Sequence, residues 1–565
     1  MRLKYDLCYN ISSMIADIHI TEKSFGDKTL MKDVKFSVDD GEKVGVVGRN
    51  GVGKSTLFGV LSGKDTDYTG EVIFRRGITV ATTAQEHHGL GDQTVMSYIL
   101  GGLPEYSKLK KIIDEYPLTM GDNMRKIEEY TQALERFDQK GFYQVEEKIE
   151  RELSNFQLDD YGNRRISSLS GGQKRLVEIV KIMHSEAHLA LIDEPTNHMD
   201  YVAKQQFIDW MNSQPHQAML IITHDRDVLG QVDRIVEIKD GQAVSYRGNY
   251  DAYLKQNAQA TTAGMNNFEQ IEKRIVNLKQ KVLDYQRLKE KSRNPGTIQK
   301  FKRLENEARA ELEELLEMEK PTFWIDKESA SQLDYKSAER YGKFKSRNIR
   351  LSMKDASSRS QHVLVRAENV AVGISERILF EDVNIDLREG EAIEIRGRNG
   401  AGKTTLIRMI LASGKSFDGG PILYSGDIFL DPQVRIGVYE QEIDERYLSD
   451  PLEKAIEKLY MSRDLSISDT KIRQLLADYL FTDADRMTPL ARLSGGQKAR
   501  FRIISMLAND PQLLVLDEPT NHLDLPSIEE LETALAKYSG AILYVSHDNY
   551  FREKLGGKVV QIGAE

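Results

Sequence analysis

The sequence predicts an α/β protein in which two tandem domains are joined by an α-helical hairpin. An internal repeat is the main reason, because residues 41–56 return as residues 390–405. Later landmarks at residues 169–173 and 193–198 return in the same order in the second copy. Between the copies, residues 256–320 are poor in glycine and dense in charge, with apolar residues at heptad spacing. At 565 residues, the chain also exceeds what one hydrophobic core usually organises.

Composition excludes several classes of protein. The net charge of −10 is spread over 166 ionisable Lys, Arg, Asp and Glu residues, so it says little about partners. Cys8 is the only cysteine, which excludes a disulfide framework and a cysteine-based zinc site. Residues 1–10 lack the apolar stretch of a signal peptide, and no run of about 18 apolar residues encodes a transmembrane helix. We therefore expect a soluble, cytoplasmic protein.

Two glycine-rich loops match the pattern G-x-x-x-x-G-K-[ST], each after a short apolar strand at residues 44–47 or 392–395. Glycines let successive backbone N–H groups face phosphates, the lysine neutralises phosphate oxygens, and the hydroxyl binds Mg²⁺. One match could be a chance glycine-rich loop, but two in register predict that the chain binds ATP or GTP. The residues expected to contact nucleotide are Gly48, Asn50, Gly51, Gly53, Lys54, Ser55 and Thr56, and Gly397, Asn399, Gly400, Gly402, Lys403, Thr404 and Thr405.

Two further apolar runs end in acidic pairs, as expected for buried parallel strands that carry carboxylates at the ligand-binding edge of a sheet. The pairs are Asp193-Glu194, after residues 189–192, and Asp517-Glu518, after residues 513–516. The aspartates are expected to bind Mg²⁺, and the glutamates to activate the attacking water as general bases. The alternative is a purely structural acidic pair at the end of a strand.

A histidine follows a later apolar strand in each copy. His224 follows Ile-Ile-Thr, and His547 follows Tyr-Val-Ser. Alone, each would be an ordinary buried or capping histidine. In this order along the chain, we expect both to contact the γ-phosphate and to take part in catalysis.

The sequence Leu-Ser-Gly-Gly-Gln, present at residues 169–173 and 493–497, resembles the signature of ATP-binding cassettes of the ABC class. The resemblance covers nearly the whole chain from Met14. It implies ATP hydrolysis with Mg²⁺, at two composite sites formed when the cassettes close head to tail. Site one would combine Lys54, Ser55, Gln85, Asp193, Glu194 and His224 with Ser494, Gly495, Gly496 and Gln497. Site two would combine Lys403, Thr404, Gln441, Asp517, Glu518 and His547 with Ser170, Gly171, Gly172 and Gln173.

The resemblance also implies that Gln85 and Gln441 join the hydroxyls and aspartates as Mg²⁺ ligands. Both sites keep every polar residue, so we expect both to hydrolyse ATP. One position departs from the family. Phe25 is placed to stack on adenine in site one, whereas Ile374 occupies the corresponding position in site two. Either nucleotide stacking is weaker in site two, or the alignment misplaces this loop residue; Phe25 as an ordinary core residue is a further alternative.

The first cassette carries extra sequence. There are 84 residues between Gln85 and Ser170 but 52 between Gln441 and Ser494. We expect the extra residues to form an arm at about 97–141, with two helical segments separated by a break at Pro117. The alternative is a slightly enlarged helical subdomain.

The connector is predicted to be an antiparallel helical hairpin that turns at residues 294–296, with a first helix of about 30 residues reaching about 45 Å. Its expected apolar stripe is Ile271, Ile275, Leu278, Val282, Tyr285, Phe301, Leu304, Ala308, Leu315 and Met318. Residues 271–303 contain 11 basic and 3 acidic side chains, whereas residues 304–320 contain 2 basic and 7 acidic ones. A solvated helical face is the ordinary explanation of such charge. Here the basic side chains lie towards the turn and the acidic ones away from it, which instead favours contact between the turn and a phosphate backbone. The predicted RNA contacts are Lys289, Lys291, Arg293, Lys300, Lys302 and Arg303.

Two soluble cassettes are compatible with a transporter ATPase subunit that works with a separate membrane protein, a DNA repair or chromosome ATPase, or a translation factor. The hairpin connector, the Met-Asp or Leu-Asp that follows each Asp-Glu-Pro-Thr-Asn-His, and residues 246–250 resemble the ABC-F family. The resemblance implies action at the ribosomal exit site, with the hairpin directed at ribosomal RNA and P-site tRNA. It leaves open whether the protein is a general translation factor or protects ribosomes from antibiotics. We expect no DNA partner, and a monomer whose own cassettes pair. The predicted segments are an N-terminal tail (1–13), a first cassette (14–254), the hairpin (255–325) and a second cassette (326–565).

Overall fold

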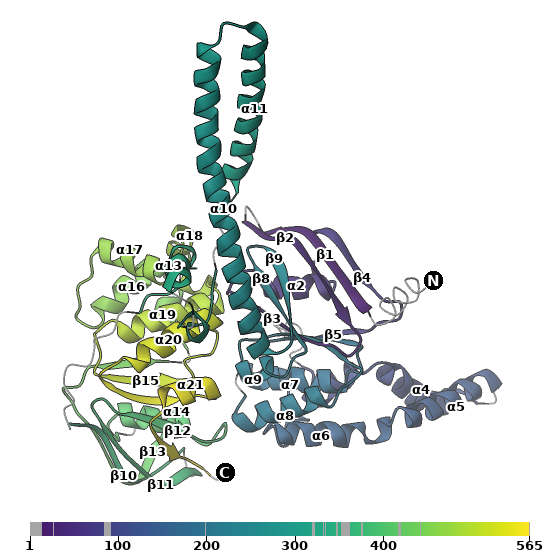
Figure 1. Cartoon of the computed structure of the whole chain (residues 1–565). Coiled ribbons are helices and arrows are strands. Elements are labelled where there is room, and N and C mark those ends of the chain that lie inside the picture. The colour runs from purple at the N-terminus through teal and green to yellow at the C-terminus, as the bar shows by residue number, and fades with distance from the viewer. Residues whose placement is uncertain are drawn as a thin grey trace. The chain divides into compact units, whose positions relative to one another are not determined.

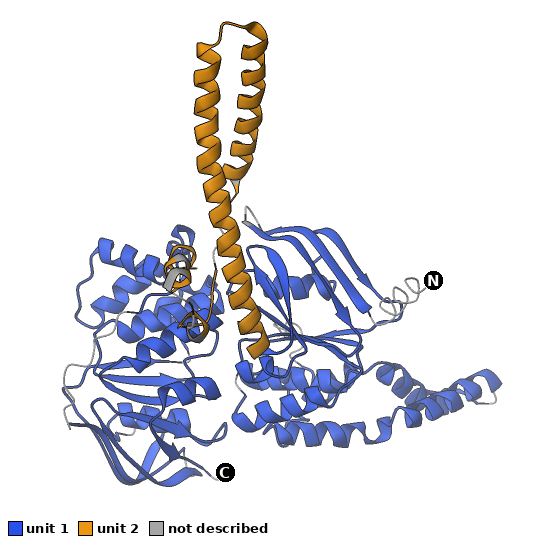
Figure 2. Ribbon diagram, viewed as in Figure 1, with its two compact units in different colours: residues 1–250, 349–565 blue, residues 251–348 orange. Residues whose placement is uncertain are grey.

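The computed structural model divides the chain into two compact units (Figure 2). One unit contains residues 1–250 and 349–565, and the other contains residues 251–348. The structure describes residues 14–25, 28–83, 92–121, 123–197, 199–318, 323–331, 333, 335–345, 348–351, 362–374, 377–415, 420–440 and 442–563. The second unit is wider than the predicted hairpin segment, because it also holds the short helices α12 (Lys327–Ser331) and α13 (Tyr335–Phe344).

The first cassette contains two sheets. The larger has six strands in the order β5-β6-β7-β3-β8-β9, and the smaller is antiparallel in the order β2-β1-β4. The strands are β1 (Met14–Phe25), β2 (Lys28–Asp39), β3 (Lys43–Gly48), β4 (Thr69–Phe74), β5 (Val80–Thr82), β6 (Leu189–Asp193), β7 (Ala218–Ile222), β8 (Arg234–Lys239) and β9 (Gln242–Arg247). Strands β6 and β7 are buried along their whole length and pair in parallel, which explains their continuous apolar sequences.

The second cassette repeats this plan. Its five-stranded sheet has the order β14-β15-β16-β12-β17, and its antiparallel sheet has the order β11-β10-β13. The strands are β10 (Val363–Ile374), β11 (Arg377–Arg388), β12 (Ala392–Arg396), β13 (Ile422–Leu430), β14 (Ile436–Tyr439), β15 (Leu513–Asp517), β16 (Ala541–Val545) and β17 (Lys558–Gln561). The strands expected before the two glycine-rich loops and the two acidic pairs are therefore confirmed as β3, β12, β6 and β15.

Helices pack against these sheets in both cassettes (Figure 1). Those of the first cassette, apart from the arm, are α2 (Lys54–Leu61), α3 (Val95–Gly101), α6 (Val145–Asn155), α7 (Gly171–His184), α8 (Tyr201–Asn212) and α9 (Arg226–Leu229). Those of the second are α14 (Lys403–Leu411), α15 (Glu445–Leu448), α16 (Leu452–Met461), α17 (Asp469–Asp478), α18 (Asp483–Arg486), α19 (Gly495–Leu507), α20 (Leu525–Ala536) and α21 (Asn549–Leu555).

Helices α4 (Tyr106–Thr119) and α5 (Met124–Gln139) lie side by side within the segment where an arm is expected (Figure 1). The pair is antiparallel, since Arg136 near the end of α5 donates to Glu105, which precedes α4, at 3.0 and 3.1 Å. The predicted break at Pro117 is wrong by two residues. The proline lies in the last turn of α4, where its missing N–H removes a single hydrogen bond, and the helix ends only after Thr119.

The second unit contains the helical hairpin of α10 (Tyr250–Lys291) and α11 (Pro295–Glu317). Helix α10 has 42 residues, longer than the predicted 30, because it already begins at Tyr250. The turn lies just before the predicted one. Asn294 caps α11 by accepting from the backbone of Gly296 at 2.9 Å, and Pro295 takes the first helical position, where its missing N–H has no cost.

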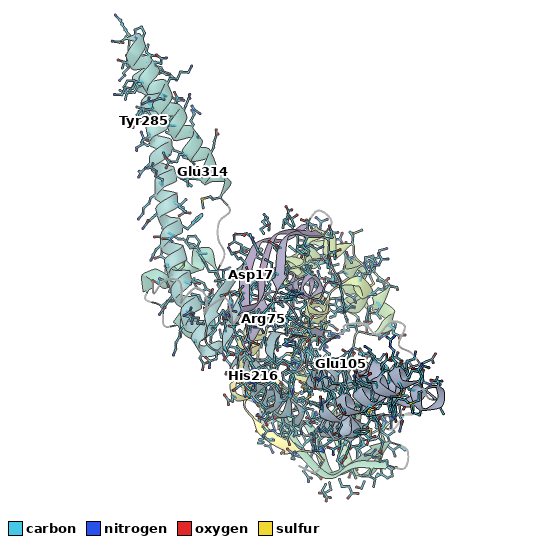
Figure 3. The ribbon with its side chains drawn as sticks, turned by 90° about the vertical axis from the view of Figure 1, so that its right-hand side faces the viewer. Asp17, Arg75, Glu105, His216, Tyr285 and Glu314 are labelled. Atoms are coloured by element: carbon cyan, nitrogen blue, oxygen red, sulfur yellow. The ribbon has the colours of Figure 1, made fainter. Side chains whose placement is uncertain are left out.

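Apolar side chains hold the hairpin together. Its buried residues are Leu278, Val282 and Ala308, packed against Tyr285, Leu312 and Leu315. Nearer the turn, Tyr285 of α10 stacks on Phe301 of α11, with ring centroids 6.4 Å apart. Glu314 of α11 lies farther from the turn (Figure 3). Met318 does not complete the stripe as predicted. It is 49% exposed because α11 ends before it, at Glu317.

A buried carboxylate ties the hairpin together near its turn. Glu305 on α11 accepts from Lys289 on α10 at 2.6 Å, from Arg309 at 3.0 Å and from Gln286 at 3.1 Å. These hydrogen bonds, that of Lys289 first, lower the pKa of Glu305 to about 2. Lys289, predicted to contact RNA, is thus engaged inside the hairpin.

We predict that Glu305→Gln removes an acid-sensitive part of the hairpin's stability. A carboxylate whose pKa is lowered by folding stabilises the folded state above its unfolded pKa, about 4.3, and loses that contribution as the pH falls towards the folded value. The melting temperature, followed by far-UV circular dichroism, should therefore differ most between wild type and variant near neutral pH. The difference should shrink as the pH falls from about 5 to about 3. A difference that stays constant over this range would contradict the assignment.

Candidate active site

The two glycine-rich loops have the same conformation. Gly53 and Gly402, which precede α2 and α14, have φ values of 101° and 99°, in the left-handed region that favours glycine. The following lysines are buried and fold back over their loops. Lys54 Nζ donates to the carbonyl of Gly48 at 2.6 Å, and Lys403 Nζ donates to the carbonyl of Gly397 at 2.8 Å. Each loop therefore holds an ammonium group among its backbone N–H groups, as an anion site requires.

The acidic pairs lie beside these loops at the ends of β6 and β15. Ser55 Oγ donates to Asp193 Oδ2 at 3.0 Å, and Thr404 Oγ1 donates to Asp517 Oδ2 at 2.7 Å. The residue that follows each strand has strained backbone: Glu194 and Glu518 have φ values of 48° and 52°. Non-glycine residues adopt this conformation rarely, and at a cost of order 1–3 kcal/mol, mostly at functional sites.

Each of these glutamates faces the predicted histidine. His224 Nε2 lies 3.5 Å from Glu194 Oε1, and His547 Nε2 lies 3.4 Å from Glu518 Oε1. Burial raises the pKa of Glu518 to about 7 and lowers that of His547 to about 3. In the first cassette, burial likewise raises the pKa of Glu194 and lowers that of His224. Both imidazoles are therefore neutral at pH 7, and both carboxyl groups are poised to exchange a proton near that pH.

The signature sequences begin helices α7 and α19 with the same cap. Ser170 Oγ accepts from the backbone of Gln173 at 3.3 Å, and Gln173 Oε1 accepts from the backbone of Ser170 at 2.9 Å. Ser494 and Gln497 repeat this capping box with the same two distances. The cap fixes the N-terminal turn of each helix, whose remaining N–H groups favour an anion.

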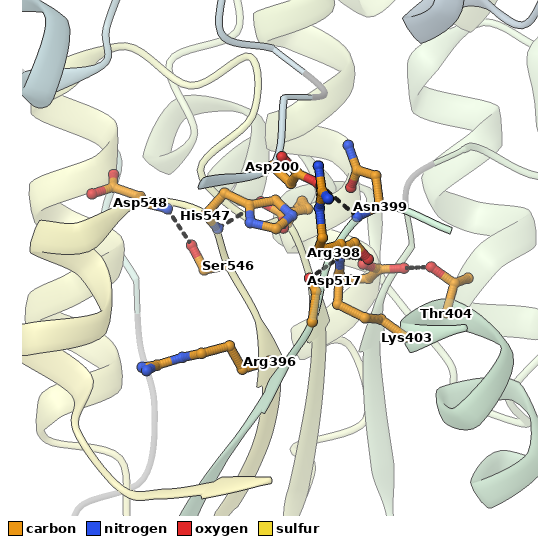
Figure 4. A network of polar contacts seen from close by, with 12 residues as sticks. Asp200, Arg396, Arg398, Asn399, Lys403, Thr404, Asp517, Ser546, His547 and Asp548 are labelled. Atoms are coloured by element: carbon orange, nitrogen blue, oxygen red, sulfur yellow. Dashed lines mark hydrogen bonds and ion pairs between the residues drawn. The ribbon is translucent and has the colours of Figure 1, made fainter. Parts of the chain in front are cut away.

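Contacts between the cassettes bring each loop to the opposite cassette. Asp200 Oδ2, which follows the first acidic pair, accepts from the backbone N–H of Asn399 at 3.0 Å (Figure 4). In the reciprocal contact, Asp524 Oδ2 accepts from the backbone N–H of Asn50 at 3.1 Å. Each glycine-rich loop therefore contacts an aspartate of the opposite cassette.

A cavity of about 1220 Å³ lies at one of these junctions. It is lined by Ser170, Gly171, Gly172 and Gln173 from the first cassette, and by Gly400, Gly402, Lys403, Thr404, Thr405, Asp517, Glu518 and His547 from the second. Apart from Gln441, the polar residues predicted for site two therefore surround a single space. Glu194 and His224 also reach its wall.

At the other junction, Asn50 of the first glycine-rich loop contacts the second cassette directly. Asn50 Nδ2 donates to the carbonyl of His522 at 2.9 Å, and the same amide lies against Gly496 of the opposite signature. A Cβ atom on Gly496 would come within 2.1 Å of Asn50 Nδ2, so any larger residue here would displace the Asn50 side chain. The signature of the second cassette thus contacts the glycine-rich loop of the first.

The structure describes four further predicted residues only in part or not at all. Gln85 and Gln441 lie outside the described residues. For Phe25, the structure gives only its place at the end of β1. Ile374 is 47% exposed and lines the cavity of site two, together with Arg377. An aliphatic side chain thus stands where an aromatic ring was expected in this family.

Several site residues were missed from the sequence. Asp200 and Asp524 belong to the repeated Met-Asp and Leu-Asp pairs, so the repeat could have pointed to them. Their contact with the opposite cassette could not be predicted from it. Arg175 was also missed. Its guanidinium donates to the backbone carbonyls of Asp193 and Glu194, although the matching residue in the second cassette is Ala499. Because this contact exists in only one cassette, the internal repeat could not reveal it.

Among the described residues, no cluster of three or more His, Cys, Asp or Glu side chains could hold a metal ion alone. The part of the chain that the structure describes also contains no helix long and apolar enough to cross a membrane.

Comparison with known proteins agrees with the repeat. The profile of the family described as ABC transporter matches residues 31–197 and 380–521. The chain is 30% identical over 566 residues to the ATP-binding protein YdiF of Bacillus subtilis (strain 168), covering 98% of this chain and 80% of that protein.

Two other relatives have more specific names. ABC transporter F family member 2 of Arabidopsis thaliana is 28% identical, with 96% of this chain and 75% of that protein covered. Ribosome protection protein VmlR of Bacillus subtilis (strain 168) is 27% identical, with 94% and 83% covered. With two cassettes that carry the ATP-binding and hydrolysis motifs, the chain is an ATP hydrolase and belongs to the ABC-F family.

Proposed function

We propose that the protein binds and hydrolyses two ATP molecules in composite sites, each made of one glycine-rich loop and the opposite signature helix. The observation that carries this proposal is the cavity of about 1220 Å³ lined by Ser170–Gln173 of one cassette and Lys403–Thr404 of the other. The reciprocal contact of Asn50 with Asp524 supports the same arrangement for site one.

The donors in these sites fit a nucleoside triphosphate with Mg²⁺. Among the described atoms, His547 Nε2, His224 Nε2 and Glu518 Oε1 are buried without a hydrogen-bond partner, as expected where phosphate and water belong. Ser55 with Asp193, and Thr404 with Asp517, would hold Mg²⁺ beside the phosphates. A hydroxyl and one carboxylate are too few to hold the ion alone, which agrees with a cation shared with phosphate oxygens.

Glu194 and Glu518 are proposed as the general bases. The backbone of each is fixed at the end of a buried strand, because Glu518 N–H donates to the carbonyl of Val545 at 3.0 Å and Glu194 N–H to that of Ile222 at 2.7 Å. The neutral His547 would donate to the γ-phosphate while Glu518 accepts the proton of the attacking water.

We predict that Glu194→Gln combined with Glu518→Gln retains ATP binding but loses hydrolysis by about 10²- to 10⁴-fold, the usual contribution of a general base. Phosphate release and equilibrium binding of a fluorescent ATP analogue measure the two effects separately.

A matched control replaces one exposed glutamate in each cassette, Glu147→Gln with Glu445→Gln, and should hydrolyse ATP at the wild-type rate. Phosphate release at near wild-type rate from the Glu194/Glu518 variant would refute the assignment of the bases.

We further propose that the ATP cycle acts on the ribosome, at the exit site with the hairpin towards P-site tRNA, either as a translation factor or as protection from antibiotics. Two observations support this proposal. The relative VmlR is named a ribosome protection protein, and cationic side chains gather at the hairpin turn. Lys291, Arg293, Lys300 and Lys302 are exposed there on both helices. A cluster of exposed cations suits phosphate backbone, whose counterions are released on contact.

We predict that changing Lys291, Arg293, Lys300 and Lys302 to glutamine weakens ribosome binding and flattens its salt dependence. Each lost phosphate contact should reduce the slope of log affinity against log salt by about 0.7 to 0.9. Co-sedimentation with ribosomes in a non-hydrolysable ATP analogue, at two salt concentrations, measures this. ATP hydrolysis without ribosomes should stay unchanged, because none of the four residues lines the cavity.

The control removes four exposed lysines of the cassettes instead: Lys35, Lys64, Lys471 and Lys537. It should keep the wild-type salt slope. A folded hairpin variant that binds ribosomes as tightly as wild type would argue against the RNA contact, and a wild-type protein that never sediments with ribosomes would favour a transporter subunit.

A further inference from the structure

A buried lysine of the first cassette contacts the catalytic segment of the second. Lys204 lies on α8, four residues after Asp200, and is only 4% exposed. Its Nζ donates to Asp227 Oδ2 at 2.6 Å in its own cassette and to the backbone carbonyl of His547 at 2.9 Å in the opposite one. It also lies 3.3 Å from Asp225 Oδ2. A buried ammonium group is costly unless it is fully paired, and these acceptors pair it, so the surroundings of Lys204 suit a cation.

The residue whose carbonyl Lys204 holds also contacts the proposed base of site two. While the carbonyl of His547 accepts from Lys204, the N–H of His547 donates to Glu518 Oε2 at 3.2 Å. Two hydrogen bonds, one to the carbonyl and one from the N–H of His547, therefore link α8 of the first cassette to Glu518 through this residue. Charge-assisted hydrogen bonds are the stronger ones, so these bonds restrain the segment.

Asn549 strengthens the junction. Its Nδ2 donates to Asp227 Oδ2 at 2.8 Å, so Asp227 accepts from both Lys204 and Asn549. Residues on both sides of Asp548 are thereby fixed to the first cassette.

Site one lacks the equivalent contact. The residue four after Asp524 is Ile528, whose buried side chain has no donor for the backbone of His224. The segment after His224 is tied instead by a side-chain ion pair, in which Arg226 Nη1 lies 2.9 Å from Glu532 Oε1 of the second cassette. The two sites are therefore held by different bonds.

We propose that Lys204 is a positioning residue for site two, acting through the backbone of His547 to hold Glu518 in its hydrolytic position. The inference rests on the proposed composite ATP sites and adds that hydrolysis in site two depends on the first cassette in a way that site one does not share. Since the cassettes must be paired for Lys204 to reach His547, their closure completes site two.

The first experiment measures ATP hydrolysis in two backgrounds, Glu194→Gln to isolate site two and Glu518→Gln to isolate site one. Lys204→Met should lower kcat at least about tenfold in the site-two background, with little change in KM, because it removes a charge-assisted bond that positions a reacting group. The loss in the site-one background should be several-fold smaller. Lys204→Arg, which keeps a cationic donor, should recover most of the turnover.

The second experiment does not depend on hydrolysis. Hydrogen–deuterium exchange in the full chain with ATP bound should become faster in Lys204→Met at the segment around His547, and stay unchanged around His224. Gln205→Ala, an exposed neighbour on α8 whose side chain bonds Asp209 in the same helix, is the matched control. If Lys204→Met fails to fold, Lys204→Met with Asp227→Asn, which also removes the nearer of the two carboxylates that Lys204 pairs, takes its place.

Equal losses of kcat in both backgrounds, or unchanged exchange around His547, would overturn the proposal. Normal hydrolysis by the variant with both Glu194→Gln and Glu518→Gln would instead refute the general bases, and the exchange experiment would still decide whether Lys204 restrains His547.

Discussion

A single buried carboxylate connects each glycine-rich loop to the opposite cassette. Asp200 is 1% exposed and uses one oxygen to cap α8, accepting from Ala203 at 2.9 Å, and the other to accept from the backbone of Asn399. Burial alone would raise the pKa of Asp200, but these backbone donors lower it, so the carboxylate stays ionised. Asp524 repeats both contacts, towards Ser527 and Asn50. The same two side chains thus cap a helix in their own cassette and contact the glycine-rich loop of the other.

From this junction the rest of the site follows. The loop that accepts the carboxylate also carries the lysine and the hydroxyl, and the strand before the carboxylate carries the acidic pair. Glu194 and Glu518 lie there in strained, left-handed backbone, which only a rigid surrounding sheet can maintain. Yet the two sites are not equivalent. Arg175 and Lys204 have Ala499 and Ile528 as counterparts, so one cassette supplies cations that the other lacks.

The sequence predicted those features that are local and repeated. Both glycine-rich loops, the acidic pairs and the buried strands β6 and β15 could be predicted because short apolar runs and fixed spacings specify them. The length of α10 could not, since residues 250–256 lack a break that would separate the helix from the cassette. Contacts across the junction were also missed. Lys204 has the appearance of an ordinary surface residue until the fold brings His547 to it, because nothing near it in the sequence reveals its burial.

The central claim is that each ATP site is built from both cassettes. The most direct measurement is a structure of the variant Glu194→Gln with Glu518→Gln bound to ATP. Composite sites require two bound nucleotides, with the γ-phosphate held by Lys403 within hydrogen-bonding distance of Ser170, and the one held by Lys54 within that distance of Ser494. Nucleotides that contact residues of only one cassette would contradict the claim.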